Sequence, residues 1–328
     1  MACLFYTRLK ISRVKRDSGN NMIYTLTFNA SLDYYAHADS VSPGAIHKIS
    51  EYELFPGGKG INVSKVLKEL GTDSVAWSFV AGSTGEMLER MLDEDGIRHD
   101  FIKLDTGMTR INVKLRTMDD QGLCETDFNG TGLVITESVI KELEMRVNAL
   151  SRDDIVVISG SIPESVTQDA FKNILMGIKE AGAVFIADIT GKYLETALGC
   201  GPFMVKPNDT EISDFFGRTV ESYEDAKEAG RKLIDRGTEI ALISMGAKGA
   251  VLCTDRDEEY VMEPPSGEVV STIGAGDSML AGFVAGYFSG MNVHDAFKQG
   301  ICAGSATAFC VSLAKGIDIK RLVDGFNI

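Results

Sequence analysis

Residues 272–278 have the composition of a phosphoryl-transfer site, because a glycine turn places one acid at the start of a predicted helix. Gly274 and Gly276 let the backbone approach a ligand closely. The free N–H groups of this first turn, which includes Ala275, point at an anion that the helix dipole also favours. Asp277 lies in the same turn and can take a proton from an attacking hydroxyl. A capped core helix that begins with an acid is the alternative interpretation.

A second glycine turn, Pro-Gly-Gly-Lys-Gly-Ile-Asn-Val at residues 56–63, follows a predicted strand and opens a predicted helix. Gly58 exposes a backbone N–H group, Lys59 adds a positive charge, and Asn62 faces the same side from the first helical turn. A phosphorylated sugar could use all three groups. The spacing is not that of a P-loop. A turn that merely ends the strand is the alternative.

Other polar residues lie in or after predicted strands. Asp33 follows the first strand and can accept hydrogen bonds from sugar hydroxyls, although Asp is also common in turns. Arg110, Asn112 and Lys114 share one face of a strand, and the planar fork of Arg suits phosphate. A solvated face is the alternative for this strand. Ser161 lies at another strand end, where it can reach a ligand.

Two further segments predict the position of a nucleotide. Asn208 can cap a helix, with Glu211 three residues later in capping-box spacing. Both side chains also carry oxygen donors suitable near Mg²⁺, directly or through water. Capping alone is the alternative. Ser244, Gly246 and Gly249 lie in a turn after an apolar strand, which indicates either a backbone turn near a nucleotide or an ordinary hairpin.

The predicted elements bring these residues to one edge of a sheet. From residue 136 onward, short apolar strands alternate with helices, which is typical of a parallel sheet covered on both faces. Such sheets bind ligands beyond the carboxyl ends of their strands. We expect helices at residues 136–149, 167–181, 191–199, 222–236, 275–289 and 293–313, and strands at 155–159, 183–188, 203–206 and 239–245.

Two early stretches, at about residues 30–56 and 98–130, have a different pattern. Their β-forming residues alternate between polar and apolar, as in a half-exposed sheet. We therefore expect a small sheet that is inserted into the α/β core in two pieces. It would serve as a lid over the site or as a contact surface for a second copy.

The amino-acid composition indicates which binding partners and which cellular compartment to expect. A net charge of −14 over 328 residues argues against a protein that binds the phosphate backbone of nucleic acids. No apolar run approaches the length of about 18 residues that a membrane span needs, so we expect no membrane partner. The six cysteines form no metal-binding motif and fit reduced thiols in a cytoplasm. Residues 1–21 are basic, and we expect a disordered extension rather than a targeting peptide.

Three ordered motifs, at residues 56–63, 206–211 and 274–278, resemble those of the ribokinase-like (PfkB) carbohydrate kinase family. The resemblance covers nearly everything from Met22 to the C-terminus. It implies a single domain over residues 22–328, with a three-layer α/β/α sandwich, a mainly parallel central sheet and a small β-sheet lid. The lid often serves for dimerisation in this family, so we expect a homodimer.

The resemblance also implies roles for the residues named above. The catalytic set would contain Asp277 as the base, with Gly274, Ala275 and Gly276 as the anion hole. The sugar-phosphate set would contain Asp33, Gly58, Asn62, Arg110 and Ser161, to which Lys59 is added because of its proximity. The ATP set would contain Asn208, Glu211, Ser244, Gly246 and Gly249, and Asn208 and Glu211 would also meet the metal through water.

Within the family, residues 109–114, the later Glu125-Thr126 pair and the lysine of the second turn favour a kinase for a phosphorylated ketohexose. The implied reaction is phosphorylation of D-fructose 1-phosphate to D-fructose 1,6-bisphosphate. Its cofactors would be ATP and Mg²⁺, with a monovalent cation such as K⁺ as a further candidate. Tagatose 6-phosphate, fructose 6-phosphate or an unphosphorylated sugar are alternative substrates. A catalytically silent sugar-phosphate sensor is the alternative from another functional class.

Overall fold

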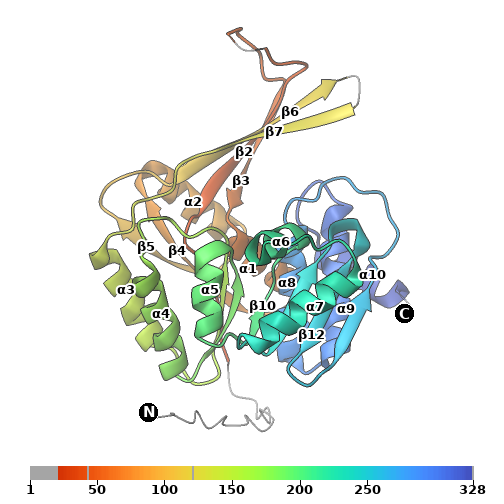
Figure 1. Cartoon of the computed structure of the whole chain (residues 1–328). Coiled ribbons are helices and arrows are strands. Elements are labelled where there is room, and N and C mark those ends of the chain that lie inside the picture. Colours follow the sequence, from red (N-terminus) through yellow and green to blue (C-terminus); the bar gives the residue numbers. More distant parts are fainter. Residues whose placement is uncertain (1–20, 43, 120–121, 327–328) are drawn as a thin grey trace.

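The computed structural model describes residues 21–42, 44–119 and 122–326, so the expected extension at residues 1–21 lies outside the described residues except for Asn21. A nine-stranded sheet forms the centre of this part of the chain (Figure 1). Its strands, in spatial order, are β13 (Glu259–Met262), β12 (Ala250–Thr254), β11 (Ile240–Ser244), β10 (Met204–Val205), β9 (Val184–Asp188), β8 (Ile155–Ser159), β1 (Ile23–Thr27), β4 (Ser74–Ala81) and β5 (His99–Leu104).

The strands from β11 to β5 are parallel, whereas β12 and β13 run antiparallel at one edge. The mainly parallel sheet predicted from the sequence is therefore confirmed. Helices cover both faces, as a parallel sheet requires. The helices are α1 (Lys59–Glu69), α2 (Gly82–Glu94), α3 (Glu137–Asn148), α4 (Gln168–Glu180), α5 (Gly191–Gly199), α6 (Asp209–Phe216), α7 (Tyr223–Asp235), α8 (Ala275–Ser289), α9 (Val293–Ala308) and α10 (Gly316–Gly325), with a short 3₁₀ turn η1 (Gly246–Lys248).

Alternating residues of the strands supply two apolar layers. Leu26 of β1 packs on the side of α3, α4, α5 and α7, and Ile23 packs on the side of α1, α8, α9 and α10. This alternation follows from the two-residue repeat of a strand. Helix α8 is apolar all round and largely buried, as expected for a core helix. None of the helices in the described ranges is long and apolar enough to cross a bilayer.

A second sheet of four strands projects from the body as an elongated ribbon (Figure 1). Its order is β3 (Glu51–Gly57), β2 (Ser31–His37), β6 (Arg110–Asp119) and β7 (Gly122–Asn129). Residues from both predicted early stretches contribute to it. Residues 99–104, which we assigned to this small sheet, instead form β5 and pair with β4 in the large sheet.

Some element boundaries differ from the prediction. The helix expected at residues 293–313 ends at Ala308, and a separate helix α10 follows. Strand β4 was not predicted, because serines interrupt its apolar pattern. Strands β12 and β13 were also not predicted. The turn after β11 thus joins two antiparallel strands, so the hairpin interpretation of this turn is correct.

Candidate active site

The N-terminus of α8 forms the centre of the site. Gly274 adopts a left-handed backbone with φ of 76°, and a Cβ there would lie 2.5 Å from the side chain of Leu313. The amide of Ala275 donates to the Thr272 carbonyl (3.3 Å). The amides of Gly274 and Gly276 have no acceptor within the described ranges. A glycine turn therefore leaves backbone donors available beside the helix dipole, as an anion requires.

Asp277 lies in the first turn of α8 and is only 5% exposed. Asn62 of α1 donates from Nδ2 to its Oδ2 at 2.8 Å, although the two residues are far apart in the sequence. Burial, reinforced by the negative charge of Asp188, raises the pKa of Asp277 to about 6. A carboxylate with such a pKa is ionised at neutral pH and basic enough to accept a proton.

A buried ion cluster that the sequence did not predict lies beside Asp277. Asp188, the last residue of β9, is 1% exposed, and its carboxylate lies 3.2 Å from Lys206 Nζ and 3.7 Å from Lys59 Nζ. Ser159 donates a hydrogen bond to it at 2.8 Å. Burial alone would raise the pKa of Asp188, but the two lysines and Ser159 outweigh it and lower that pKa.

Lys59 is the first residue of α1, after Gly58, whose φ is 123°. A Cβ on Gly58 would lie 2.8 Å from Thr27, so glycine is needed for this close approach to β1. Lys59 Nζ lies 3.8 Å from Glu211 Oε1. The charge of Asp188 is the main cause that raises the pKa of Lys59, which keeps it a cation. This lysine thus lies between two acids next to Asp277.

Asp33 lies within β2, the strand that follows β1. Its Oδ1 accepts hydrogen bonds from Ser31 Oγ and Asn112 Nδ2, both at 2.8 Å. Asn112 and Lys114 are 6% and 8% exposed, whereas Ile111 on the opposite face is 43% exposed. The solvated-face interpretation of β6 is therefore wrong, because its polar face is the buried one.

Arg110, Asn29 and Ser161 form a polar cluster where β1, β6 and β8 approach one another. Arg110 Nη2 donates to the Asn29 carbonyl (2.8 Å), and Asn29 Nδ2 donates to Ser161 Oγ (3.1 Å). Arg110 Nε is buried without a hydrogen-bond acceptor in the described part of the chain. Burial lowers the pKa of Arg110 from its ordinary value. A half-buried guanidinium with a buried, unpaired donor is suited to an anionic ligand.

The N-terminus of α6 adjoins the same edge of the sheet. Asn208 and Glu211 form a full capping box: Glu211 N donates to Asn208 Oδ1 (2.7 Å), and Asn208 N donates to Glu211 Oε2 (2.9 Å). The capping interpretation is therefore correct. It leaves Glu211 Oε1 facing Lys59, so capping and ligand contact are compatible at this residue.

The predicted nucleotide turn lies next to this helix end. Asn208 and Ser244 form a parallel β-bridge, and the Ser244 amide donates to the Pro207 carbonyl at 3.1 Å. Gly246 and Gly249 have φ values of 54° and 87°. A Cβ on Gly249 would lie 2.0 Å from the carbonyl oxygen of Met262, so only glycine fits there. The two segments predicted for the nucleotide are thus adjacent.

The structure brings the predicted site residues together from three parts of the fold. Ser161, Asn208 and Ser244 lie at or just after the ends of β8, β10 and β11 of the large sheet, Asp33 and Arg110 lie in β2 and β6 of the small sheet, and Asn62 and Asp277 lie in the first turns of α1 and α8. A cavity of about 410 Å³ has two of these residues, Asp33 and Asn62, in its lining, and the rest of its wall comes mainly from β3, α1, α2 and residues 312–315. The sequence analysis did not name Asp188 and Lys206 as site residues. Each ends a predicted apolar strand, and a charged residue in that position was the signal that could have indicated them. A base, amide donors and cations that converge in this way can transfer a phosphoryl group.

Comparisons with known proteins agree with this geometry. Residues 22–320 match the profile of the pfkB family carbohydrate kinases. A 1-phosphofructokinase from Bacillus subtilis is 39% identical, with 92% of this chain and 97% of that protein covered. A D-tagatose-1-phosphate kinase from Bacillus licheniformis is 34% identical, with 92% and 96% covered.

A solved structure is similar as well. Phosphofructokinase-2 from Escherichia coli, in complex with potassium, superposes with a TM-score of 0.87 at 26% identity, and the match covers 93% of this chain and 99% of that one. The nine-stranded sheet and the projecting four-stranded sheet are therefore the framework of a known enzyme family. The chain belongs to the pfkB family of carbohydrate kinases.

Proposed function

We propose that this protein is a 1-phosphofructokinase, which transfers the γ-phosphoryl group of ATP to the 6-hydroxyl of D-fructose 1-phosphate. The products are D-fructose 1,6-bisphosphate and ADP. The observation that carries the proposal is the buried carboxylate of Asp277 beside the free amides of α8. The 39% identity to a 1-phosphofructokinase over most of both chains supports the choice of substrate.

In this proposal, Asp277 accepts the proton of the attacking hydroxyl, and the amides of Gly274 and Gly276 stabilise charge on the transferred group. Asp33 and Asn62 orient sugar hydroxyls. Ala275, the third residue of the predicted anion hole, contributes least because its amide already has an acceptor.

The phosphate already present on the substrate would bind at the other end of the sugar. The Arg110 and Ser161 cluster supports this, because Arg110 Nε is buried and unpaired in the described structure. Lys59 lies between Glu211 and Asp188, which favours contact with the transferred phosphoryl group over contact with the substrate phosphate. The backbone N–H group of Gly58 would donate a hydrogen bond to the sugar.

Nucleotide phosphates would lie between the N-terminus of α6 and the turn that contains Ser244, Gly246 and Gly249. The described residues hold no group of three or more His, Cys, Asp or Glu side chains that could bind a metal alone. Glu211 Oε1 nevertheless faces the site, and Mg²⁺ commonly binds through one carboxylate, waters and substrate phosphates. Glu211, with Asn208 nearby, would therefore hold Mg²⁺ through water. The ion supplies charge neutralisation to the phosphates.

A monovalent cation is a further proposed cofactor, supported by the potassium complex of the Escherichia coli relative. D-Tagatose 1-phosphate is a second candidate substrate, supported by the 34% identical relative that is named for it.

The five cysteines in the described residues are all unpaired. This is typical of a reducing compartment and supports a cytoplasmic location.

We also propose that residues 22–328 act as one kinase domain, in which the four-stranded sheet is both a lid and the interface of a homodimer. The outer face of this sheet carries three exposed large apolar side chains, with Tyr52 68%, Phe128 58% and Ile111 43% exposed. Val113 of β6 pairs with Phe128 of the edge strand β7 on this face. An exposed apolar patch of this kind is typical of a protein interface.

Release of ADP, measured with a coupled assay on a panel of sugars, tests the proposed function. The panel contains D-fructose 1-phosphate, D-tagatose 1-phosphate, tagatose 6-phosphate, fructose 6-phosphate and free fructose. We expect the highest kcat/KM with D-fructose 1-phosphate. A preference for another sugar would reassign the substrate. Binding of sugar phosphate without any ATP turnover would support the silent sensor instead.

A further inference from the structure

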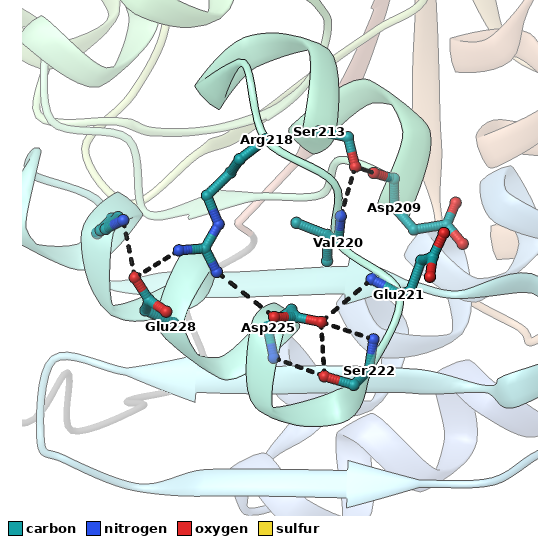
Figure 2. A network of polar contacts seen from close by, with 9 residues as sticks. Asp209, Ser213, Arg218, Val220, Glu221, Ser222, Asp225 and Glu228 are labelled. Atoms are coloured by element: carbon teal, nitrogen blue, oxygen red, sulfur yellow. Dashed lines mark hydrogen bonds and ion pairs between the residues drawn. The ribbon is translucent and has the colours of Figure 1, made fainter.

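The linker between α6 and α7, residues 217–222, contacts both segments that the proposed function assigns to ATP. On the α6 side, Ser213 Oγ donates to the Asp209 carbonyl at 2.6 Å, and the Val220 amide donates to the same Oγ at 2.9 Å (Figure 2). Asp209 is the first residue of α6, directly after Asn208. The linker is thus attached to the helix end that would meet the nucleotide phosphates.

On the other side, the linker and the first residue of α7 hold the nucleotide turn. Lys248 Nζ donates to the Glu221 carbonyl at 2.8 Å, and Tyr223 Oη donates to the Lys248 carbonyl at 2.8 Å. Lys248 is the last residue of η1 and precedes Gly249. These two bonds run in opposite directions between the same two segments, so they fix the turn at its backbone and at its side chain.

A network of polar contacts joins the linker to the first turns of α7 (Figure 2). Arg218 Nη1 donates to Glu228 Oε1 at 2.6 Å, and its Nη2 lies 3.6 Å from Asp225 Oδ1. Asp225 also forms a capping box with Ser222, whose hydroxyl donates to Asp225 Oδ2 at 2.6 Å. Ion pairs this exposed add little to stability. Their consequence is positional, because they define where Glu221 and Tyr223 lie.

We infer that residues 217–223 form a strut that sets the separation between the N-terminus of α6 and the nucleotide turn, and that Tyr223 is a positioning residue for ATP. Apart from the strut, the two ATP segments meet through the parallel pairing of β10 with β11 just before them, the Asn208–Ser244 bridge and the hydrogen bond from the Ser244 amide to Pro207. Residues that hold the ligand-contacting groups in place can change the affinity for the ligand without touching it. The inference rests on the proposed kinase function.

Tyr223→Phe tests the strut, because it keeps the ring and removes the hydroxyl that bonds to the Lys248 carbonyl and also contacts Glu263. Loss of one hydrogen bond that holds the turn should raise the KM for ATP by about two- to tenfold. We expect kcat and the KM for D-fructose 1-phosphate to stay within about twofold. Isothermal titration with a non-hydrolysable ATP analogue should show a similar loss of affinity.

Ser213→Ala removes the other attachment of the strut and should give the same selective rise in the KM for ATP. Arg231→Gln is the matched control, because it removes an ion pair between the same helix α7 and Glu259 without contact to either ATP segment. We expect wild-type ATP affinity for the control. Thermal melts show that all variants are folded at the assay temperature.

An unchanged KM for ATP in both Tyr223→Phe and Ser213→Ala would overturn the strut. Equal changes in both substrate constants would overturn it as well, since a general loss of stability has no selectivity for the nucleotide. These outcomes differ from a failure of the proposed function, in which the wild-type protein itself would not turn over ATP with any sugar phosphate.

Discussion

Asp277 combines burial, a nearby negative charge and one strong hydrogen-bond donor. Its raised pKa of about 6 has burial as the main cause and Asp188 as the second. Asn62, Lys59 and Lys206 act in the opposite direction and keep the carboxylate available at neutral pH. A base must be unprotonated to act, so in the proposed role of Asp277 these opposing effects would set the pH above which the enzyme is active.

Asp277→Asn should lower kcat by about 10²- to 10⁴-fold, the usual contribution of a positioned acid–base group. The amide is close in shape and can still accept from Asn62 through its oxygen, so the KM values should change little. Steady-state kinetics with D-fructose 1-phosphate and ATP measure this. Near-normal turnover in the variant would remove Asp277 from the role of base.

The activity of the wild-type protein should fall as the pH drops through about 6. The sign follows from the role: protonation below this pH removes the group that accepts the hydroxyl proton, whereas the carboxylate persists above it. A profile of kcat/KM against pH checks this, and the residual activity of Asp277→Asn should lack the same acid limb. An acid limb near pH 4 would mean that Asp277 has its ordinary pKa.

Arg110→Ala should raise the KM for the sugar phosphate by about 10- to 100-fold, as expected for loss of a charged hydrogen-bond donor. The kcat should change much less, because Arg110 belongs to the cluster with Asn29 and Ser161 rather than to the α8 terminus. Lys114→Met is a matched control, since Lys114 lies on the same strand as Arg110 but donates to Asp127 of the neighbouring strand β7. If KM is unchanged in Arg110→Ala, the substrate phosphate binds elsewhere.

At the scale of elements, the site depends on the N-termini of three helices. Helix α6 follows β10 of the large sheet, α1 follows β3 of the small sheet, and α8 follows the loop after β13. Helices α1, α6 and α8 begin at Lys59, Asp209 and Ala275, and each starts with a glycine or a capping residue next to the ligand edge. Local sequence signals of this kind are short, which explains why the three motifs could be predicted.

Glu211→Gln separates the structural role of the α6 capping box from its proposed metal role. Glutamine keeps an oxygen that can accept from the Asn208 amide, so the melting temperature should stay within a few degrees. The lost charge should raise the Mg²⁺ concentration needed for half-maximal activity by about tenfold. A large drop in melting temperature with an unchanged Mg²⁺ requirement would assign Glu211 to capping alone.

The parts that the sequence did not predict depend on contacts between distant segments. Asp188 and Lys206 end two neighbouring strands, and their pairing becomes visible only once the sheet order is known. Strand β6 is a second example. Its alternation of polar and apolar residues is clear in the sequence, but which of its faces is buried depends on its pairing with β2 and on the contact with Asp33. The helix predicted to residue 313 was too long, because the apolar pattern continues past Ala308 into the segment that supports Gly274.

At the scale of the whole molecule, the four-stranded sheet has two different faces. Its inner face carries Asp33 and Asn112 toward the site, and its outer face carries exposed Tyr52 and Phe128. A monomer would leave these large side chains in water, whereas a second copy that packs there would bury them. Lid closure and dimer formation would then involve the same sheet.

Phe128→Asp should shift the protein from dimer to monomer in size-exclusion chromatography with light scattering, because a charge on the apolar face is costly to bury. Met145→Asp, at a residue 65% exposed on α3, is the control and should leave the mass unchanged. A wild-type protein that is already monomeric, or a dimer in the Phe128→Asp variant, would contradict an interface at the lid.

A crystal structure with D-fructose 1-phosphate and a non-hydrolysable ATP analogue tests the central claim most directly. The account predicts that a carboxylate oxygen of Asp277 lies about 3 Å from the 6-hydroxyl of the sugar. The terminal phosphate of the analogue should face the free amides at the start of α8. A complex in which this side chain points away from the accepting hydroxyl, with both ligands bound, would contradict the account.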